Sequence, residues 1–206
     1  MRLTKYGHAC VRLEIGDRVL VIDPGTLSEG EALTGATAVL ITHEHEDHID
    51  VDKLKAARES NPELTVHTHA ALAASLGAGV TGVAVGDTFT AAGFSVRAVG
   101  GEHAEIVDGL PGCTNIGFIV DGLYHPGDSM FVPAEAVDTL LVPISGPWVK
   151  LAEAVEFARA VAPARAFPIH EAHLSAIGLE SFDWWMATKG GTDYARIPLG
   201  ESVDLP

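Results

Sequence analysis

The sequence predicts an α/β protein in which strands come first along the chain and helices alternate with strands later. Residues 10–15 alternate apolar with polar side chains, which is the period of a half-buried strand. Residues 38–42 form a short apolar run rich in β-branched side chains, as in a strand that is buried on both faces. Residues 150–160 carry apolar side chains at helical spacing. Two sheets are one option for this order of elements.

The boundaries of the elements are marked by turn residues. Gly16-Asp17 separates two strands and predicts a hairpin, which Asp23-Pro24-Gly25 ends. Loops are expected at residues 26–35 and in the Gly-rich segment 100–115. The predicted strands are 10–15, 18–22, 38–42, 64–68, three short strands within 80–99, 116–120, 139–142 and 164–169. The predicted helices are 52–59, a short Ala-rich helix after residue 68, 150–160 and 179–188.

Length and composition fit one domain that covers residues 1–206. A chain of 206 residues, 47% of them hydrophobic, buries a sizeable core. No apolar run approaches the length of a membrane-spanning helix, and the N-terminus lacks the apolar stretch of a secretory signal. We therefore expect a cytoplasmic protein with no membrane partner, and a homo-oligomer is left open.

Charge and cysteine content narrow the function classes. The formal net charge is −15, and the 13 Lys and Arg residues are scattered rather than clustered as a phosphate-tracking surface requires. Nucleic acid is therefore not expected as a bulk partner, and a small-molecule substrate is. Cys10 and Cys113 are too few for a disulfide framework, and we interpret both as buried small residues.

The run His43-Glu44-His45-Glu46-Asp47-His48 places four metal-binding side chains within six residues. His43 and His45 lie two residues apart, so on an extended chain both imidazoles can reach one cation. Asp47 and His48 follow at once and diverge from each other, which a second ion nearby would explain. The run begins directly after a buried strand, where ligands stand on a rigid base. A polar loop with chance histidines is the alternative, and the number of donors disfavours it.

The run resembles the His-x-His-x-Asp-His signature of the metallo-β-lactamase superfamily. The further stations of that family's pattern follow in order: Asp23 after an early strand, His103 in Gly101-Glu102-His103, Asp128 in Gly127-Asp128, and His170 in Pro168-Ile169-His170. The phrases Tyr6-Gly7-His8-Ala9-Cys10 and Tyr124-His125-Pro126-Gly127-Asp128-Ser129 resemble a branch of small metal-dependent hydrolases related to L-ascorbate-6-phosphate lactonase.

The resemblance implies an αββα sandwich with two metal ions at the edge between the sheets. It implies that the first ion is held by His43, His45 and His103, that the second is held by Asp47, His48 and His170, and that Asp128 bridges both. Seven groups exceed the four-coordinate shell of one zinc ion, but they suit two ions that share a carboxylate. We expect two divalent cations, zinc in the first place, with manganese or iron as alternatives for this mixed nitrogen and oxygen set.

The resemblance also implies a reaction. The redox branch of the family, which uses di-iron, has Glu at position 45, so His45 favours hydrolysis. Asp47 is the predicted catalytic residue, which would orient a hydroxide or take up its proton. We expect hydrolysis of a small ester, lactone or phosphorylated molecule. A phosphodiesterase or nuclease with the same metal pair is one alternative, and a non-catalytic metal-binding protein is another. The acidic net charge disfavours a phosphodiesterase or nuclease. The complete set of ligands disfavours a non-catalytic metal-binding protein.

The remaining polar candidates lie outside the signature. His8, Asp23 and His125 are expected to support the ligands from behind or to contact the substrate. His67 and His69 also have two-residue spacing, but no further donor follows closely, so a strand end is favoured over a third metal site. His173 is expected at the surface, with a substrate contact left open.

Overall fold

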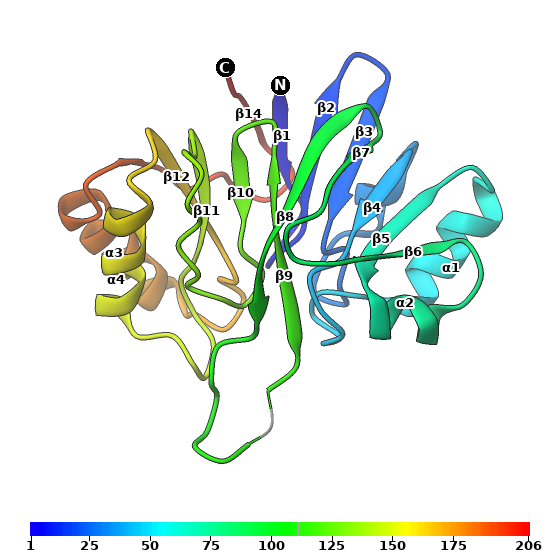
Figure 1. The fold of residues 1–206 in the computed structure, drawn as a ribbon. Coiled ribbons are helices and arrows are strands. Elements are labelled where there is room, and N and C mark those ends of the chain that lie inside the picture. The colour runs from blue at the N-terminus through cyan, green and yellow to red at the C-terminus, as the bar shows by residue number, and fades with distance from the viewer. Residues whose placement is uncertain (111) are drawn as a thin grey trace.

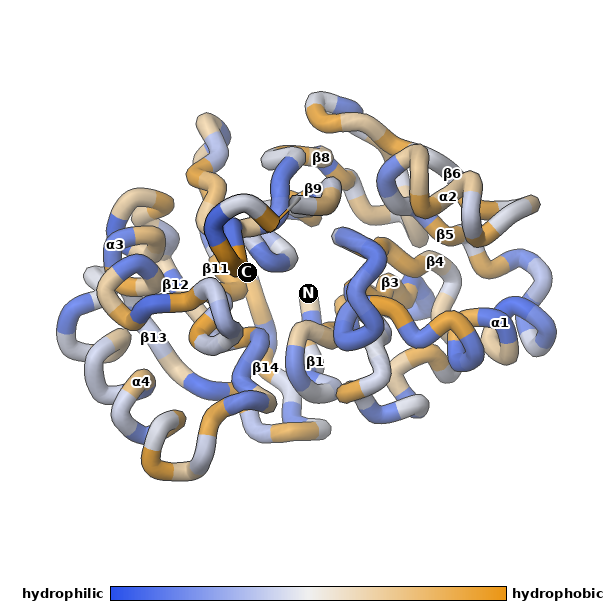
Figure 2. Tube along the Cα trace, turned by 90° about the horizontal axis from the view of Figure 1, so that it is seen from below, coloured by the Kyte–Doolittle hydropathy of each residue, from blue (hydrophilic) through white to orange (hydrophobic). Residues whose placement is uncertain are grey.

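A computed structural model describes residues 1–110 and 112–206. Two seven-stranded sheets pack face to face, and helices cover the outer face of each (Figure 1). Figure 2, which views the molecule along the layers, shows α1 (Val51–Ser60) and α2 (Ala70–Leu76) outside one sheet and α3 (Leu151–Val161) and α4 (Ala176–Lys189) outside the other. This is the αββα arrangement expected from the sequence.

The two sheets share one pattern of strand directions. Sheet A has the order β14 (Ser202–Asp204), β1 (Arg2–Lys5), β2 (Val11–Ile15), β3 (Arg18–Ile22), β4 (Ala38–Leu40), β5 (Thr65–His69) and β6 (Val80–Val83). Sheet B has the order β13 (Asp193–Tyr194), β12 (Arg165–Ile169), β11 (Thr139–Pro143), β10 (Leu123–His125), β9 (Thr114–Val120), β8 (Phe94–Glu102) and β7 (Thr88–Ala91). In each sheet antiparallel strands come first along the chain and parallel strands follow. The exception is β14, the last strand, which pairs antiparallel with β1 at the edge of sheet A.

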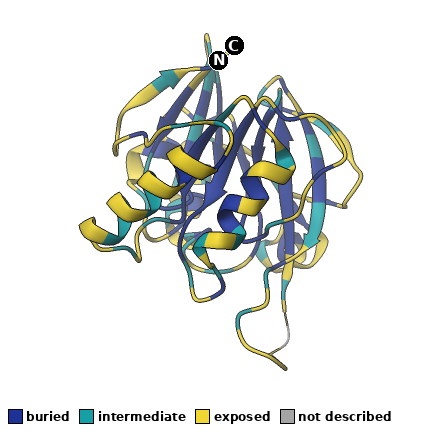
Figure 3. Cartoon of the chain, turned by 90° about the vertical axis from the view of Figure 1, so that its left-hand side faces the viewer, coloured by how far each residue is buried: buried dark blue, intermediate teal, exposed yellow. Residues whose placement is uncertain are grey.

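The core is layered because apolar side chains alternate between the two faces of the strands. In β3, Leu20 and Ile22 pack between the sheets, whereas Val19 and Val21 pack beneath the outer helices. A third apolar cluster lies between sheet B and the helices α3 and α4. Figure 3 shows the exposed outer faces of these helices over buried strands. Among the described helices, none is both long and apolar enough to span a bilayer.

The predicted elements are present, and the differences have local causes. Within the loop predicted for residues 100–115, Gly100 and Gly101 still pair with Ile116 and Asn115, so β8 and β9 extend into it. A 3-10 helix, η1 (Gly30–Leu33), lies in the loop predicted for residues 26–35. The strands β10, β13 and β14 are two or three residues long, too short for a periodic pattern to reveal.

Candidate metal centre

The candidate residues all follow the carboxyl end of a strand. They are His8 after β1, Asp23 after β3, the run His43–His48 after β4, His103 after β8, Asp128 after β10 and His170 after β12. Both sheets therefore contribute, and segments that lie far apart in the sequence meet at one end of the sandwich.

The metal-binding side chains form two groups. In each group, one donor atom from every residue lies within 4.8 Å of the donor atoms of the others. The first cluster consists of His43, His45, His103 and Asp128. The second cluster consists of His8, Asp47, His48 and His170. All seven residues that the resemblance implies as ligands lie in these two clusters. Asp128, the implied bridge, falls in the first cluster, and His8 joins the second in addition.

Asp128 lies between the two clusters. Its Oδ2 is 3.2 Å from Nε2 of His103 and 3.1 Å from Nε2 of His170, while its Oδ1 is 2.9 Å from Nε2 of His48. One carboxylate therefore faces imidazoles of both clusters. This is the geometry expected of a group that bridges two ions.

Several donor atoms at the centre are buried and make no hydrogen bond of good geometry within the described part of the chain, although some of them face one another at ion-pair distance. These atoms are Nε2 of His48, Nε2 of His103, both ring nitrogens of His170 and Oδ1 of Asp128. Leaving a buried polar atom unpaired costs about 1–3 kcal/mol, so such a concentration in a native fold requires an explanation. Divalent cations would satisfy these lone pairs, and imidazole with carboxylate is a suitable donor set. The residues therefore fit two metal ions.

Neighbouring groups turn the imidazole lone pairs toward the first cluster. Thr42 Oγ1 donates to Asp23 Oδ2 at 2.7 Å, so its oxygen accepts from Nδ1 of His43 at 3.0 Å. Nδ1 of His103 donates to the carbonyl of Ala104 at 2.6 Å. Both histidines consequently carry their proton on Nδ1 and present Nε2 to the centre.

Asp23 supports the second cluster from behind. Its Oδ2 accepts from Nδ1 of His48 at 2.7 Å, and its Oδ1 accepts from the backbone N–H of Thr42 at 2.8 Å. The side chain is fully buried. A carboxylate that holds a histidine in this way fixes the ring and raises its basicity toward a metal ion.

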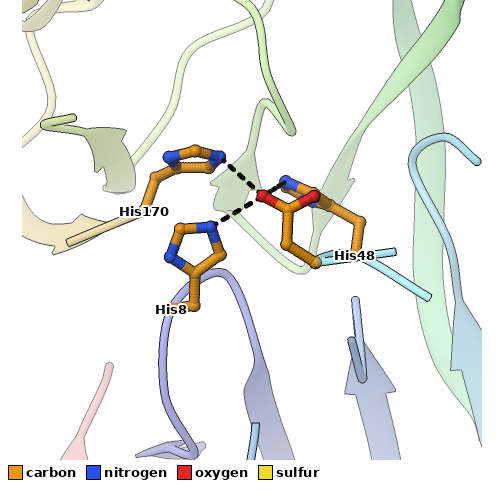
Figure 4. Close-up of side chains that lie close together, drawn as sticks. His8, His48 and His170 are labelled. Carbon is orange, nitrogen blue, oxygen red and sulfur yellow. Dashed lines mark hydrogen bonds and ion pairs between the residues drawn. The ribbon is translucent and has the colours of Figure 1, made fainter. Parts of the chain in front are cut away.

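His8 holds Asp47. The ring of His8 is buried, and burial lowers its pKa, so it is neutral and carries one proton. Its Nδ1 accepts from the backbone N–H of Ala172 at 3.4 Å, which leaves Nε2 to donate to Asp47 Oδ2 at 3.0 Å. Figure 4 shows His8, His48 and His170 turned toward one carboxylate oxygen, which is Oδ2 of Asp47. A donor in this position orients the carboxylate.

Backbone strain is concentrated at the site. His8, Asp23 and His170 have φ angles of 49°, 51° and 63°, in the left-handed region that costs a non-glycine residue about 1–2 kcal/mol. The backbone N–H of His170 donates to the carbonyl of His8 at 3.2 Å, so two of these strained residues hold each other. Gly25 is required for a steric reason, because a Cβ there would lie 2.0 Å from the carbonyl oxygen of Asp47.

The carboxylates of the centre favour positive charge on one of its histidines. Burial lowers the pKa of His43 well below its usual range. Burial opposes protonation of His48 as well, but the carboxylates of Asp128 and Asp23 outweigh it and raise the pKa of His48 to about 10. The pKa of Asp128 is in turn held well below its usual range by His48 against the effect of burial. A cation between carboxylates is therefore favoured at this position.

Comparison with known proteins identifies the family. Residues 2–170 match the model of a family described as the beta-lactamase superfamily domain. The chain belongs to the metallo-β-lactamase superfamily. It is 30% identical over 224 residues to a UPF0173 metal-dependent hydrolase of Methanoregula boonei, a match that covers 100% of this chain and 99% of that protein. It is 48% identical over 210 residues to Protein Rv0786c of Mycobacterium tuberculosis, covering 98% and 99% of the two chains.

A solved structure supports the fold class. Igni18, a metallo hydrolase of the archaeon Ignicoccus hospitalis, superposes with a TM-score of 0.78 at 22% identity, covering 100% of this chain and 98% of that one. The predicted metallo-β-lactamase fold is therefore confirmed. The chain belongs to the family whose members are named UPF0173 metal-dependent hydrolases.

Two other histidines lie beside the clusters without belonging to either group of metal donors. Nε2 of His125 donates to the carbonyl of Ala9 at 2.8 Å, and its Nδ1 accepts from the N–H of Gly127 at 3.1 Å. His125 is fully buried and closes the turn that precedes Asp128. His173 is exposed, and its ring centroid lies 5.5 Å from that of His170.

The second pair of histidines has other partners. His67 stacks on the ring of Phe89 at 4.8 Å between centroids. His69 bonds the N-terminus of α2 through Nδ1, and its Nε2 lies 3.0 Å from Glu44 Oε2. Neither belongs to a group of three or more metal donors among the described residues, in agreement with the favoured interpretation as a strand end.

The structure adds supporting residues that sequence reasoning missed. Lys5 is buried beneath the second cluster, where its Nζ lies 2.9 Å from Glu171 Oε2 and donates to the carbonyl of His8. Burial lowers the pKa of Lys5, against the effect of Glu171. Glu171 follows His170 directly, and Thr42 precedes His43. The only sequence signal that could have pointed to Glu171 and Thr42 was thus their position next to a predicted ligand.

Proposed function

We propose that this protein hydrolyses a small ester, lactone or related molecule with two zinc ions, and that Asp47 manages the proton of the attacking water. The observation that supports this most is the pair of imidazole-rich clusters joined by Asp128, whose Oδ1 and Oδ2 face His48 and His103 at 2.9 and 3.2 Å. A binding protein with one structural ion needs no shared carboxylate.

Zinc is the proposed metal because neutral imidazoles dominate the donor set. The centre offers five histidines as ligands, His43, His45, His48, His103 and His170, against the carboxylates of Asp47 and Asp128. Manganese and iron accept the same mixture of nitrogen and oxygen, and manganese prefers more oxygen. Metal analysis of protein purified without added metal, together with reconstitution by each ion in turn, distinguishes the three.

The chemistry divides between the ions and the chain. Two divalent cations, when bound, lower the pKa of a water and polarise the carbonyl oxygen of the substrate. The water oxygen forms a bond to the carbonyl carbon, the bond to the leaving group breaks, and the proton of the water ends on that group. Asp47 is placed to hold this proton, since its half-buried Oδ2 is oriented by His8 at 3.0 Å and reaches His170 at 3.4 Å.

The test combines metal analysis with three probes: p-nitrophenyl butyrate, dihydrocoumarin as a lactone, and bis(p-nitrophenyl) phosphate. We expect Asp47→Asn to lower hydrolysis by about 10²–10⁴-fold, the range for removal of a general base. Asp52→Asn, an exposed Asp five residues along, is the matched control and should keep wild-type rates. Wild-type rates in metal-loaded Asp47→Asn protein reject the role of Asp47. Failure of the two-metal wild-type protein on every probe rejects the hydrolase proposal in favour of metal binding alone.

Three narrower expectations stay predictions. They are a place in the branch of small hydrolases related to L-ascorbate-6-phosphate lactonase, a single domain over residues 1–206 and a small molecule as the binding partner. Faster cleavage of a lactone probe than of the open-chain ester would support the first.

A further inference from the structure

A pocket of about 620 Å³ opens beside the first cluster. It is lined by His45 and His103 and by the end of β8, the loop that follows and the start of β9. Its volume lies within the range of small-molecule sites, about 300–1,000 Å³. Because two histidines of the first cluster form part of its wall, a molecule in this pocket lies next to the metal centre.

The charged side chains of this pocket are carboxylates. Glu102 and Glu105 line it, and the lining residues that the structure describes include neither Lys nor Arg. Glu44 adds a third negative charge nearby. Burial raises the pKa of Cys113, a residue of the pocket wall, to about 11, and the charge of Glu44 contributes to this increase. The pocket therefore repels anions beyond the reach of the metal ions.

A second pocket, of about 320 Å³, lies near the second cluster. His173 and Ser145 connect it to the second cluster, since the ring of His173 is 5.5 Å from that of His170 and Ser145 Oγ donates to the carbonyl of His170. Its other walls are mainly apolar and comprise Ile144, Val149, Leu174 and Phe182 together with Gly146 and Pro147. It too is lined by no Lys or Arg among the described residues.

Two basic side chains, one beneath the second cluster and one next to the second pocket along the chain, are already paired. Lys5 is buried against Glu171 at 2.9 Å. Lys150, which follows the pocket residue Val149, extends into solvent and pairs with Glu153 at 2.9 Å. Recognition of a phosphate or carboxylate on a substrate would require free cations or convergent donors of this kind.

We infer that the substrate is an acyl compound, an ester, thioester or lactone, that is uncharged or cationic and has an apolar acyl group, with neither phosphate nor carboxylate on it. The inference rests on the proposed hydrolase function. The metal ions attract the oxygen of the reacting group, whereas the acidic and the apolar pocket contact the remainder of the molecule. Phosphorylated sugars and nucleic acids carry charges that neither pocket compensates.

Matched thioesters test the sign of this preference. S-butyrylthiocholine and S-butyrylthioglycolate have the same acyl group, and their leaving groups differ in charge. The two-metal protein should cleave the cationic thioester at least about tenfold faster in kcat/KM, a difference of about 1.4 kcal/mol. The acetyl analogue of the cationic probe should be slower by about tenfold because it buries two fewer methylene groups. p-Nitrophenyl butyrate should be cleaved and p-nitrophenyl phosphate should not.

Variants then locate the preference in the pocket. The double variant Glu102→Gln/Glu105→Gln should reduce the cationic-to-anionic ratio by at least about fivefold without loss of metal, and Glu105→Lys should reduce it further. Glu156→Gln, an exposed glutamate on α3, is the matched control and should leave the ratio unchanged.

An anionic probe cleaved as fast as the cationic one, or a phosphate ester cleaved in preference to the acyl ester, overturns the inference and leaves the hydrolase function intact. An unchanged ratio of cationic to anionic cleavage in the Glu102→Gln/Glu105→Gln variant also overturns the inference. Failure on every probe with two ions bound rejects both.

Discussion

The first and the second cluster have similar donors but are supported differently. In the first, Thr42 and a backbone carbonyl orient the imidazoles, and the cluster opens into the acidic pocket. In the second, the carboxylate of Asp23 holds His48, His8 holds Asp47, and a buried Lys5–Glu171 pair lies beneath. The larger, acidic pocket thus adjoins the first cluster, which has fewer supporting contacts. The second cluster, which contains the predicted catalytic carboxylate, receives most of the supporting contacts. Support of this kind is what precise placement of a reactive group requires.

The largest effect is expected at Asp128, the carboxylate that faces both clusters. Asp128→Asn should lower metal content from two ions to one or none and reduce hydrolysis by more than about 10³-fold, since the reaction depends on both ions. Metal analysis and an ester assay provide the measurement. Two tightly bound ions in this variant would show that Asp128 does not bridge.

A smaller, asymmetric effect is expected from Asp23→Asn. The amide has one acceptor oxygen, so it cannot accept from both the backbone N–H of Thr42 and Nδ1 of His48, and the hold on His48 is weakened. The affinity for the second ion should fall by about 10–100-fold, the usual result of removing such a support. The first ion should be weakened less, because Asp23 reaches His43 only through Thr42. Stepwise metal titration by calorimetry separates the two ions, and equal weakening of both would contradict the asymmetry.

A still smaller effect is expected from removing the group that orients Asp47. His8→Ala should lower kcat by about tenfold and leave KM and the two-ion content unchanged. His8→Gln should recover part of the loss because its amide can donate to Asp47. If His8→Ala instead loses one ion, His8 is a metal ligand rather than a positioning residue.

The smallest effect concerns the metal-free protein and pH. The pKa of His48 is raised from 6.5 to about 10, so its protonated form stabilises the fold. That stabilisation is complete below about pH 6.5 and is lost as the pH rises toward 10. We expect Tm of the metal-free protein to fall by at least about 4 °C across this range. The metal-loaded protein should show a flatter dependence, and a rising Tm in the metal-free protein would contradict the assignment.

The sequence, together with its resemblance to a family, was sufficient to name the donors and to propose His8 and Asp23 as supports, but it did not reveal which group each support contacts. His43, His45, Asp47 and His48 are contiguous, and their chemistry is visible in the order of the residues. His103, Asp128 and His170 needed the resemblance to a family, because separation along the chain hides their proximity. The contact of His8 with Asp47 depends on left-handed backbone at His8 and on Ala172, far along the chain. Physical contacts of this kind are set by tertiary packing and leave no periodic signal.

The same division between local and tertiary signals holds for the fold. The hairpin β2–β3 and the buried strand β4 follow from local patterns, whereas β13 and β14 exist only because a neighbouring strand pairs with them. The continuation of β8 through Gly100 and Gly101 was hidden for the same reason, since two glycines in sequence are typical of a loop.

The two ends of the chain are neighbours, with Arg2 opposite Asp204 in sheet A, and in Figure 1 they lie at the far end from the loop after β8 that lines the acidic pocket. An affinity tag, a reporter domain or a chemical anchor on either end therefore projects away from the opening. An immobilised form, tethered through either end, would present that opening to the surrounding solution.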